Sequence, residues 1–251
     1  TEAEIAATQM LRKALLHDLL THGVPGWHTE WQHVPGLGEM PACWEVATLG
    51  ECLMAIEAGR SPLCAMRPAQ PGEWGVLKVS AVSWGEFQAE ENKALLRSAQ
   101  PDPRHEVRPG DVLISRANTP ELVGRAVLVR TTRPRLLLSD KTLRLVPDPE
   151  RISQEYLLLS LSTPSSRSQI SAAASGSSRS MYNVSQDALR QVRISLPSLA
   201  EQQRITDLLG SLAETVQGAH DELSDAKALK FALAEGLLTG QVRVKPRAEA
   251  L

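Results

Sequence analysis

Basic side chains are concentrated in one part of this 251-residue sequence. Residues 44–199 carry 19 Lys and Arg against 16 Asp and Glu, although the whole chain has a net charge of −2. Guanidinium and ammonium groups bind phosphate oxygens, so this part predicts a face that contacts a polyanion; a solvated β surface is the alternative. Nine of the cations lie between positions 104 and 144: Arg104, Arg108, Arg116, Arg125, Arg130, Arg133, Arg135, Lys141 and Arg144.

The residue patterns of common active sites are absent from the sequence. It contains no Gly-rich phosphate loop, no Gly-x-Ser-x-Gly elbow, and no Gly-rich S-adenosylmethionine loop paired with an Asn/Asp-Pro-Pro-aromatic motif. Glu91-Asn92-Lys93 matches the end of a nuclease motif, but the only aspartate before it, Asp18, lies in a predicted helix. We therefore expect no catalytic residues and no bound cofactor.

The cysteines and histidines do not predict a metal site or a disulfide. Cys43, Cys52 and Cys64 are odd in number and lack Cys-x-x-Cys spacing. The spacing of His28, His33 and Cys43 fits no zinc site type. No run of 18 apolar residues could span a membrane, and the first ten residues lack the order of a signal peptide, so we expect a cytoplasmic protein.

The middle of the chain contains short β-branched or Leu-rich runs separated by turn residues, a pattern that predicts an α+β fold with a mixed, β-rich domain. Ten serines between residues 160 and 180 suggest a flexible loop by composition. The expected strands are 75–80, 111–116, 125–130, 135–139, 142–147 and 192–197, and the expected short helices are 153–162 and 185–190.

Helices are predicted at both ends of the chain. A capping box at Thr1–Glu4 opens a short helix to about Leu20, and a second box at Ser198 opens a helix to about residue 239, with the Glu201 carboxylate expected to bond the cap N–H. An apolar seam near period 3.5 predicts a coiled coil about 60 Å long, the alternative being a surface helix bent around its own domain. The seam residues are Ile205, Leu209, Leu212, Val216, Leu223, Leu229, Leu233 and Leu237.

The two ends of the sequence also resemble each other. Residues 11–24 read LRKALLHDLLTHGV and residues 229–242 read LKFALAEGLLTGQV, with seven of fourteen positions identical. Convergence of two Leu-rich helix ends is one explanation. The shared Leu-Leu-Thr ending favours a repeated structural unit instead.

These features together resemble the specificity (S) subunits of type I restriction-modification systems. The likeness is strongest in LPSLAEQQRI (196–205), which opens the long helix, and in KALKFALAEGLLTG (227–240), which ends it. RPGDVLIS (108–115), MYNVS (181–185) with the serine-rich segment before it, and GEMPACWEVATLGE (38–51) resemble the target recognition domain of that family.

The resemblance implies one recognition domain where the family has two, either as a half-subunit or as a fragment. It implies binding to double-stranded DNA, reading one half of a bipartite target, and docking of methyltransferase (M) and restriction (R) subunits. If the chain is complete, two copies are expected to pair antiparallel as a homodimer. The expected domains are an N-terminal helix (1–23), a connector (24–43), the recognition domain (44–197), a coiled-coil helix (198–240) and a tail (241–251).

Candidate DNA contacts follow from side-chain geometry. Arg and Asn have the fork geometry for guanine and adenine edges, and Ser and Lys suit phosphates. Asn118 precedes Thr119-Pro120 and has a plain turn role as its alternative. The candidates are Ser115, Arg116, Asn118, Arg125 and Lys141, with Arg179, Tyr182 and Asn183 as a second group.

Two other functions remain compatible with the sequence. A coiled-coil adaptor with a β-rich peptide-binding domain would show binding that is insensitive to salt, unlike a phosphate-binding protein. A DNA-modifying enzyme with a divergent site would transfer a label from S-adenosylmethionine to DNA without further subunits.

Overall fold

The computed structural model describes residues 2–178 and 181–239, and the chain divides into two compact units. The first unit comprises residues 1–16 and 207–251, and the second comprises residues 17–206. The division therefore falls inside the two long helices rather than at the ends of the predicted recognition domain. Thr1, which was expected to cap the first helix, and the expected tail lie outside the described residues.

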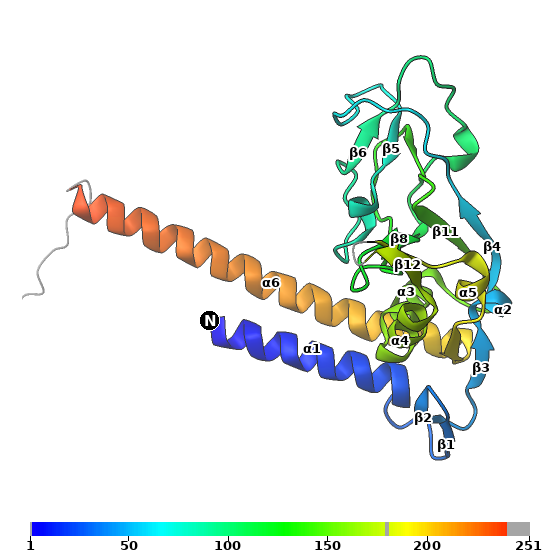
Figure 1. The fold of residues 1–251 in the computed structure, drawn as a ribbon. Coiled ribbons are helices and arrows are strands. Elements are labelled where there is room, and N and C mark those ends of the chain that lie inside the picture. The colour runs from blue at the N-terminus through cyan, green and yellow to red at the C-terminus, as the bar shows by residue number, and fades with distance from the viewer. Residues whose placement is uncertain (1, 179–180, 240–251) are drawn as a thin grey trace, which may run out of the picture. The chain divides into compact units, whose positions relative to one another are not determined.

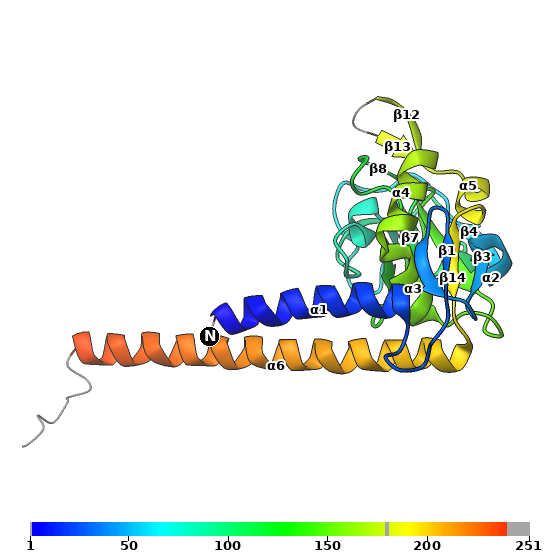
Figure 2. The ribbon, with the colours of Figure 1, turned by 90° about the horizontal axis from the view of Figure 1, so that it is seen from below.

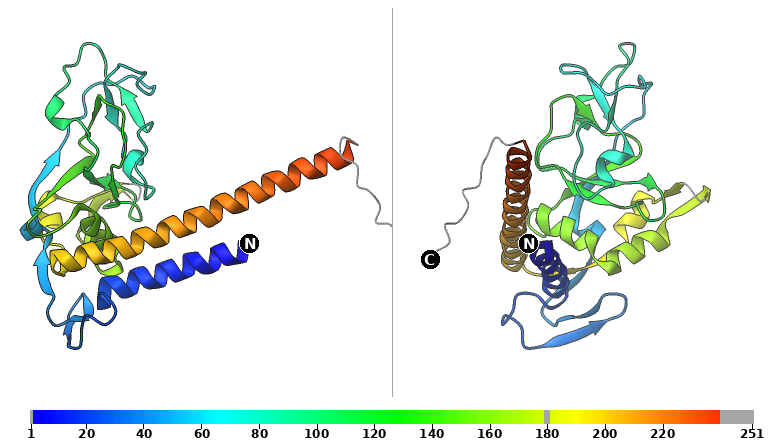
Figure 3. Two further views of the ribbon diagram at one scale, coloured as in Figure 1. Left: turned by 180° about the vertical axis from the view of Figure 1, so that it is seen from behind. Right: turned by 90° about the vertical axis from the view of Figure 1, so that its left-hand side faces the viewer.

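The first unit consists of segments from two helices, α1 (Glu2–His22) and α6 (Leu199–Leu238). The parts that belong to this unit lie side by side and run in opposite directions (Figure 1 and Figure 2), as is also seen from behind in Figure 3. With 40 residues, α6 is about 60 Å long. The long uninterrupted helix predicted from the apolar period is thus present.

Exposure changes along the apolar seam of α6. Ile205 and Leu209 are buried, and Leu212 and Leu223 are half-buried. Leu229, Leu233 and Leu237 are 60%, 48% and 45% exposed. The side chain of Val216 lies outside the description. The far half of the seam is therefore available to another apolar surface.

The second unit is built on small sheets. A four-stranded antiparallel sheet has the order β4-β11-β7-β9, and a three-stranded sheet has the order β10-β5-β6 with β10 and β5 parallel. The strands of these sheets are β4 (Leu53–Ala58), β5 (Gly75–Leu77), β6 (Asn92–Ala94), β7 (Val112–Ser115), β9 (Ala126–Leu128), β10 (Leu136–Leu137) and β11 (Thr142–Pro147).

Apolar side chains from both of these sheets form one buried cluster. Two 3-10 helices, η1 (Val79–Val82) and η2 (Pro103–His105), accompany the strands. The expected strand at 75–80 therefore ends early, because its second half turns into η1. The cluster comprises Leu77, Ala81, Val82, Val107, Leu113, Val127, Val129, Leu136 and Leu138.

Residues 160–178 of the serine-rich segment are folded, which corrects the expectation of a flexible loop for this part. Thr163 caps a helix whose first residue is Pro164, and Ile170 on that helix is fully buried. The serine content predicted a loop, but an N-terminal cap and one buried apolar residue stabilise a helix here. The short helices are α2 (Leu49–Cys52), α3 (Gln154–Ser162), α4 (Pro164–Ala173) and α5 (Gln186–Arg190).

The expected connector also contains regular structure. β1 (Trp31–Val34) and β2 (Gly38–Pro41) form an antiparallel hairpin whose turn includes Gly36 at φ +86°. After this hairpin, β3 (Glu45–Thr48) pairs antiparallel with β14 (Arg193–Leu196). Strands of four residues carry little periodic signal, which explains why the sequence did not reveal the hairpin.

A buried carboxylate, that of Glu201, ties three segments together at the start of α6. Glu201 Oε1 accepts a hydrogen bond from Val24 N at 3.1 Å and lies 2.6 Å from His28 Nε2. Glu201 Oε2 accepts a hydrogen bond from Trp44 Nε1 at 2.9 Å. The expected capping box is thus only half formed: Ser198 Oγ accepts from Glu201 N at 3.3 Å, while the carboxylate serves the other segments.

The next residue, Gln202, ties the same helix to another part of the unit. Its Oε1 accepts from Ser153 N at 2.9 Å, and its Nε2 donates to the carbonyls of Arg151 and Pro197 at 2.8 and 3.0 Å. Gln202 is fully buried. The Glu-Gln pair therefore fixes the first turn of α6 within the second unit.

Candidate nucleic-acid interface

A three-stranded sheet brings the two predicted groups of DNA-contacting residues together. It has the order β12-β13-β8, with β8 (Ala117–Asn118), β12 (Ser175–Ser178) and β13 (Met181–Asn183). Tyr182 pairs with Asn118, and Asn183 pairs with Ala117. The three strands appear together at one edge of the unit in Figure 2. Residues more than 60 positions apart in the sequence thus become neighbours.

Backbone hydrogen bonds place four more candidates near this sheet. Arg116 N donates to Lys141 O at 2.8 Å, and Arg116 O accepts from Val184 N at 3.0 Å. Ser115 N donates to Arg125 O at 2.8 Å on the other side of the same strand end. Arg125 and Lys141 have exposed side chains, and Arg116 is half-buried. The end of β7 therefore has several basic residues around it.

Ser115 itself is not placed to contact DNA, which corrects its inclusion among the candidates. It is fully buried, its hydroxyl donates to Leu122 O at 2.7 Å, and it accepts from Arg125 N at 3.1 Å. Both hydrogen-bonding roles of the hydroxyl are thus used inside the domain. Ser115 instead fixes the turn that carries Arg125.

Asn118 makes the hydrogen bonds of a turn residue, the alternative that the sequence left open. Its Oδ1 accepts from Thr119 N at 2.9 Å, and its Nδ2 donates to Ser83 Oγ at 2.8 Å. Tyr182 is half-buried and Asn183 is exposed, while Arg179 lies outside the described residues. Of the two predicted amide readers, Asn183 is the one whose side chain faces solvent.

Seven of the nine clustered cations fall into two kinds, while Arg133 and Arg135 donate hydrogen bonds to backbone carbonyls. Arg104 pairs with Asp102 at 2.7 Å, and Arg144 pairs with Glu57 at 2.7 Å and with Asp111 at 3.0 Å. The guanidinium groups of these two arginines are thus engaged by carboxylates of the domain. Five others form no ion pair with any residue in the ranges 2–178 and 181–239: Arg108, Arg116, Arg125, Arg130 and Lys141.

Arg125 adds to a locally positive region. The pKa of the Arg167 guanidinium is lowered, first by its burial and second by the nearby charge of Arg125. Arg167 Nη2 donates to Val123 O at 2.8 Å, so its own position is fixed. Two guanidinium groups close enough to repel each other are stabilised when an anion binds between or beside them.

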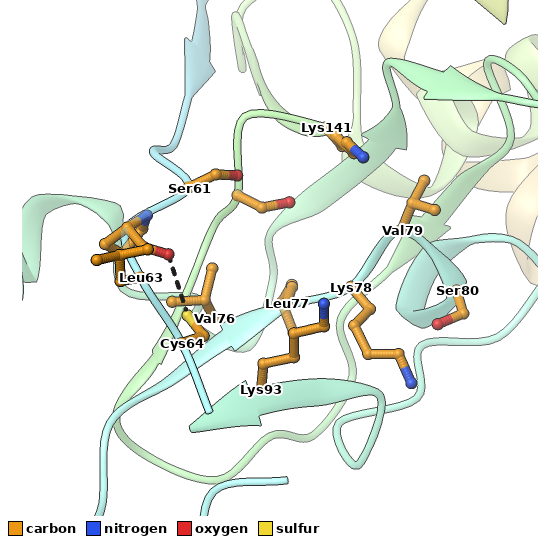
Figure 4. Close-up of a pocket in the computed structure, with 12 residues that line it drawn as sticks. Ser61, Leu63, Cys64, Val76, Leu77, Lys78, Val79, Ser80, Lys93 and Lys141 are labelled. Atoms are coloured by element: carbon orange, nitrogen blue, oxygen red, sulfur yellow. Dashed lines mark hydrogen bonds between the residues drawn. The ribbon is translucent and has the colours of Figure 1, made fainter. Parts of the chain in front are cut away.

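A cavity of about 400 Å³ is lined by three lysines, one of which is the candidate Lys141. Lys78 follows β5, Lys93 lies on β6, and Lys141 precedes β11; Figure 4 shows them around the same hollow. Lys78 is paired with Glu91 at 2.7 Å, and its hydrogen bond is the main reason why the pKa of that carboxyl is lowered. Lys93 and Lys141 make no ion pair with any residue that the structure describes.

The sequence did not single out Lys78 or Lys93 as site residues. Lys93 is conspicuous in the sequence only as part of the chance nuclease match, and the cavity is assembled from segments around positions 61–64, 76–80 and 139–141. The signal that could have found them is their position at the ends of predicted strands. Their position indicates a shared site only when the pairing of β5 with β6 is known.

Other kinds of site are not evident in the described part of the chain. Among the described residues, His, Cys, Asp and Glu do not gather in groups of three that could hold a metal ion. In the same part of the chain, every helix is too short or too polar to cross a membrane.

Comparison with curated proteins identifies one group of relatives. The chain is 35% identical to the Type I restriction enzyme EcoEI specificity subunit of Escherichia coli over 201 residues, which are 79% of this chain and 34% of that protein. It is 25% identical to the Type I restriction enzyme MjaVIII specificity subunit of Methanocaldococcus jannaschii, over 96% of this chain and 56% of that protein. The chain thus spans about a third to just over half the length of these relatives. No family model matches it.

A solved structure shares the fold. The HsdS subunit from Thermoanaerobacter tengcongensis superposes with a TM-score of 0.58 at 21% identity, covering 96% of this chain and 53% of that one. The α+β architecture with a long C-terminal helix is therefore shared with about half of that solved chain.

Proposed function

This chain is related to type I restriction enzyme specificity subunits, and we propose that it reads one half of a bipartite DNA sequence as part of such a system. The observation that carries the proposal is the convergence, on one region of the second unit, of cations that make no ion pair with the described residues. Arg116, Arg125 and Lys141 surround the end of β7, and Tyr182 and Asn183 lie on the paired strand β13. Such a set combines charge for phosphates with donors for base edges.

We assign two roles within this set. Arg116, Arg125 and Asn183 have the donor geometry for base edges in the major groove. Lys93 and Lys141, at the mouth of the cavity in Figure 4, suit phosphate oxygens as point charges. Phosphate contacts would set position and affinity, and the base contacts would set the sequence that is read.

The phosphate contacts can be tested by fluorescence anisotropy with duplex DNA over a range of salt concentrations. Replacing Lys93 and Lys141 with Met should lower the slope of log K against log salt by about 0.9 for each lysine that binds a phosphate. Arg104→Ala is the matched control, because Arg104 is exposed but paired with Asp102. A slope that is unchanged in the double variant refutes the lysine assignment, and wild-type binding that ignores salt favours the peptide-binding adaptor instead.

The base contacts require a cognate site, which selection from a random duplex library would supply. Arg116→Ala should then cost about 1–3 kcal/mol on the selected site and relax one base position. The same comparison applies to Arg125→Ala and Asn183→Ala. If all three substitutions weaken cognate and random DNA equally, these side chains contact only the backbone of the duplex.

We also propose that the exposed seam of α6 binds an equivalent helix. Leu229, Leu233 and Leu237 are too exposed to be satisfied by the described chain alone. The partner helix belongs either to a second copy in a homodimer or to another part of a longer protein, and the greater length of the relatives is compatible with both. Leu229→Glu combined with Leu233→Glu, two changes in the exposed part of the seam, should turn a dimer into monomers in light scattering; a wild-type monomer at tens of micromolar counts against the homodimer.

The chemistry of the system would then reside in partner subunits. We propose that methyltransferase and restriction subunits dock on this chain and that the chain contributes sequence choice. Purified chain incubated with DNA and labelled S-adenosylmethionine should transfer no label by itself. Transfer of label at a rate above that of a reaction without the chain would assign catalysis to this chain.

A further inference from the structure

We propose that Cys43 is a peroxide-reactive thiol, activated by His28 and Glu201. Cys43 Sγ lies 3.4 Å from His28 Nδ1, and His28 Nε2 lies 2.6 Å from Glu201 Oε1. Cys43 is exposed, whereas the side chains of His28 and Glu201 are 8% and 4% exposed. A thiol, an imidazole and a buried carboxylate in line form the arrangement that activates a cysteine nucleophile.

The carboxylate determines which nitrogen of His28 carries the proton. Ionised Glu201 can only accept hydrogen bonds, so His28 Nε2 must donate to it. The lone pair of Nδ1 then faces Cys43 Sγ and accepts the thiol proton. The resulting imidazolium is stabilised by Glu201, which is the role of the third member in such triads.

Both neighbours of Cys43 in the chain are held in place. Trp44 N donates to Pro41 O at 3.1 Å, which closes the turn that carries Cys43. Gln32 Nε2 lies 3.1–3.3 Å from the carbonyls of Pro41, Ala42 and Trp44. Trp44 Nε1 is bonded to the same carboxylate as His28. The thiol is therefore positioned by contacts on each side rather than by chance proximity of a mobile loop.

The other two cysteines provide a contrast within the same chain. Cys52 is buried, and burial raises the pKa of its thiol to about 11. Burial also raises the pKa of the Cys64 thiol, whose Sγ lies 3.3 Å from Pro62 O. Neither has a histidine partner among its described contacts. Oxidation is therefore expected at Cys43 first.

The proposed step is the two-electron oxidation of Cys43 by a hydroperoxide. His28 Nδ1 takes the thiol proton, and the thiolate attacks one peroxide oxygen, so that an S–O bond forms as the O–O bond breaks. The leaving oxygen takes the proton from His28 Nδ1 and departs as water, or as an alcohol from an organic peroxide. Sulfur is oxidised to the sulfenic acid, and the peroxide is reduced.

The test is the rate at which each cysteine of the full chain reacts at pH 7. Limiting iodoacetamide, with peptide mass spectrometry at each cysteine, gives the alkylation rates; a peptide of residues 38–48 is the reference for an unassisted Cys43. An ordinary thiol is only a few per cent thiolate at this pH, so Cys43 in the protein should react on the order of tenfold faster than in the peptide. Hydrogen peroxide followed by dimedone should label Cys43 before Cys64.

Substitution at the histidine separates activation from simple exposure. His28→Asn keeps a polar side chain but removes the base, and it should return the Cys43 rate to that of the peptide if circular dichroism shows the fold intact. The wild-type comparison stands even if that variant does not fold. The proposal is overturned if Cys43 in the folded wild-type chain reacts no faster than in the peptide, or if dimedone labels Cys64 first.

Discussion

Replacing Glu201 with Ala should destabilise the second unit far more than the loss of a helix cap would. In the wild-type structure the carboxylate satisfies Val24 N, Trp44 Nε1 and His28 Nε2, all in buried or nearly buried surroundings. Alanine leaves each of these donors without its partner, and the space that the side chain filled is too enclosed for its loss to be neutral.

The magnitude follows from those contacts. A buried donor that loses its acceptor costs about 1–3 kcal/mol, and Glu201→Ala removes the acceptor of three such donors. We therefore expect Glu201→Ala to lower the free energy of unfolding by about 3–5 kcal/mol. A residue that only capped its helix would cost about 0.5–2 kcal/mol, so the two explanations predict different values.

Glu201→Gln refines the test because it keeps the shape of the side chain. If the amide nitrogen replaces Oε1, it meets the donor Val24 N; if it replaces Oε2, it meets the donor Trp44 Nε1. Either orientation leaves one buried donor facing another. This variant should therefore cost about 1–3 kcal/mol, between wild type and Glu201→Ala.

The assay is urea unfolding followed by circular dichroism, which avoids direct effects on the fluorescence of Trp44. Ser198→Ala is the control, since it removes the hydroxyl that accepts from Glu201 N at 3.3 Å and should cost about 0.5–2 kcal/mol. The reasoning is refuted if Glu201→Ala destabilises by no more than Ser198→Ala. In that case the carboxylate contacts add nothing to stability beyond capping.

Three further predictions concern other parts of the second unit. Gly23→Ala should destabilise the protein clearly more than Gly26→Ala in the same urea assay. Both glycines have positive φ, a conformation that costs an alanine about 1–2 kcal/mol, but a Cβ at Gly23 would lie 2.5 Å from the Glu201 carboxylate, whereas a Cβ at Gly26 meets nothing within 4 Å. Arg67→Met should raise the pKa of Glu73 from about 2 toward its ordinary 4.5 in an NMR titration, and an unchanged pKa would show that Arg67 is not the cause of the low value. Because the pKa of Glu73 is depressed in the folded protein, its contribution to stability is present above pH 4.5 and is lost as the pH falls toward 2. Ser115→Ala should reduce stability by about 1–3 kcal/mol, and a change of base preference without loss of stability would restore this residue as a DNA contact.

Elements with a strong local signal could be predicted from the sequence. The strand expected at 142–147 is β11, with the same bounds, and the helix expected from 198 to about 239 is α6, which ends at Leu238. Alternating or heptad-like apolar positions specify such elements through burial alone. The helix α4 in the serine-rich segment could not be predicted in this way, because it depends on a cap at Thr163 and on the burial of Ile170 against other parts of the fold.

The site was predictable only at the level of its neighbourhood. Residues 116–118 and 182–183 were expected to act in one function, and β8 does pair with β13. Ser115 was misjudged because all of β7 is buried, so a polar residue at the end of that strand faces inward. Lys93 and Lys141 line the same cavity although they are far apart in the sequence, and the sequence alone does not show that they are neighbours.

The pairing of β3 with β14 has a consequence for how such a chain can change over time. Glu45 lies opposite Leu196, so the roughly 150 residues between them leave and return at neighbouring points. A segment whose two ends are already held together can be exchanged for another of different length at little extra entropic cost, because closing the loop depends only weakly on its length. The pairing of β3 with β14 therefore fixes both ends of this segment, and a replacement segment would have to keep the hydrogen bonds that Arg151 and Ser153 make with Gln202.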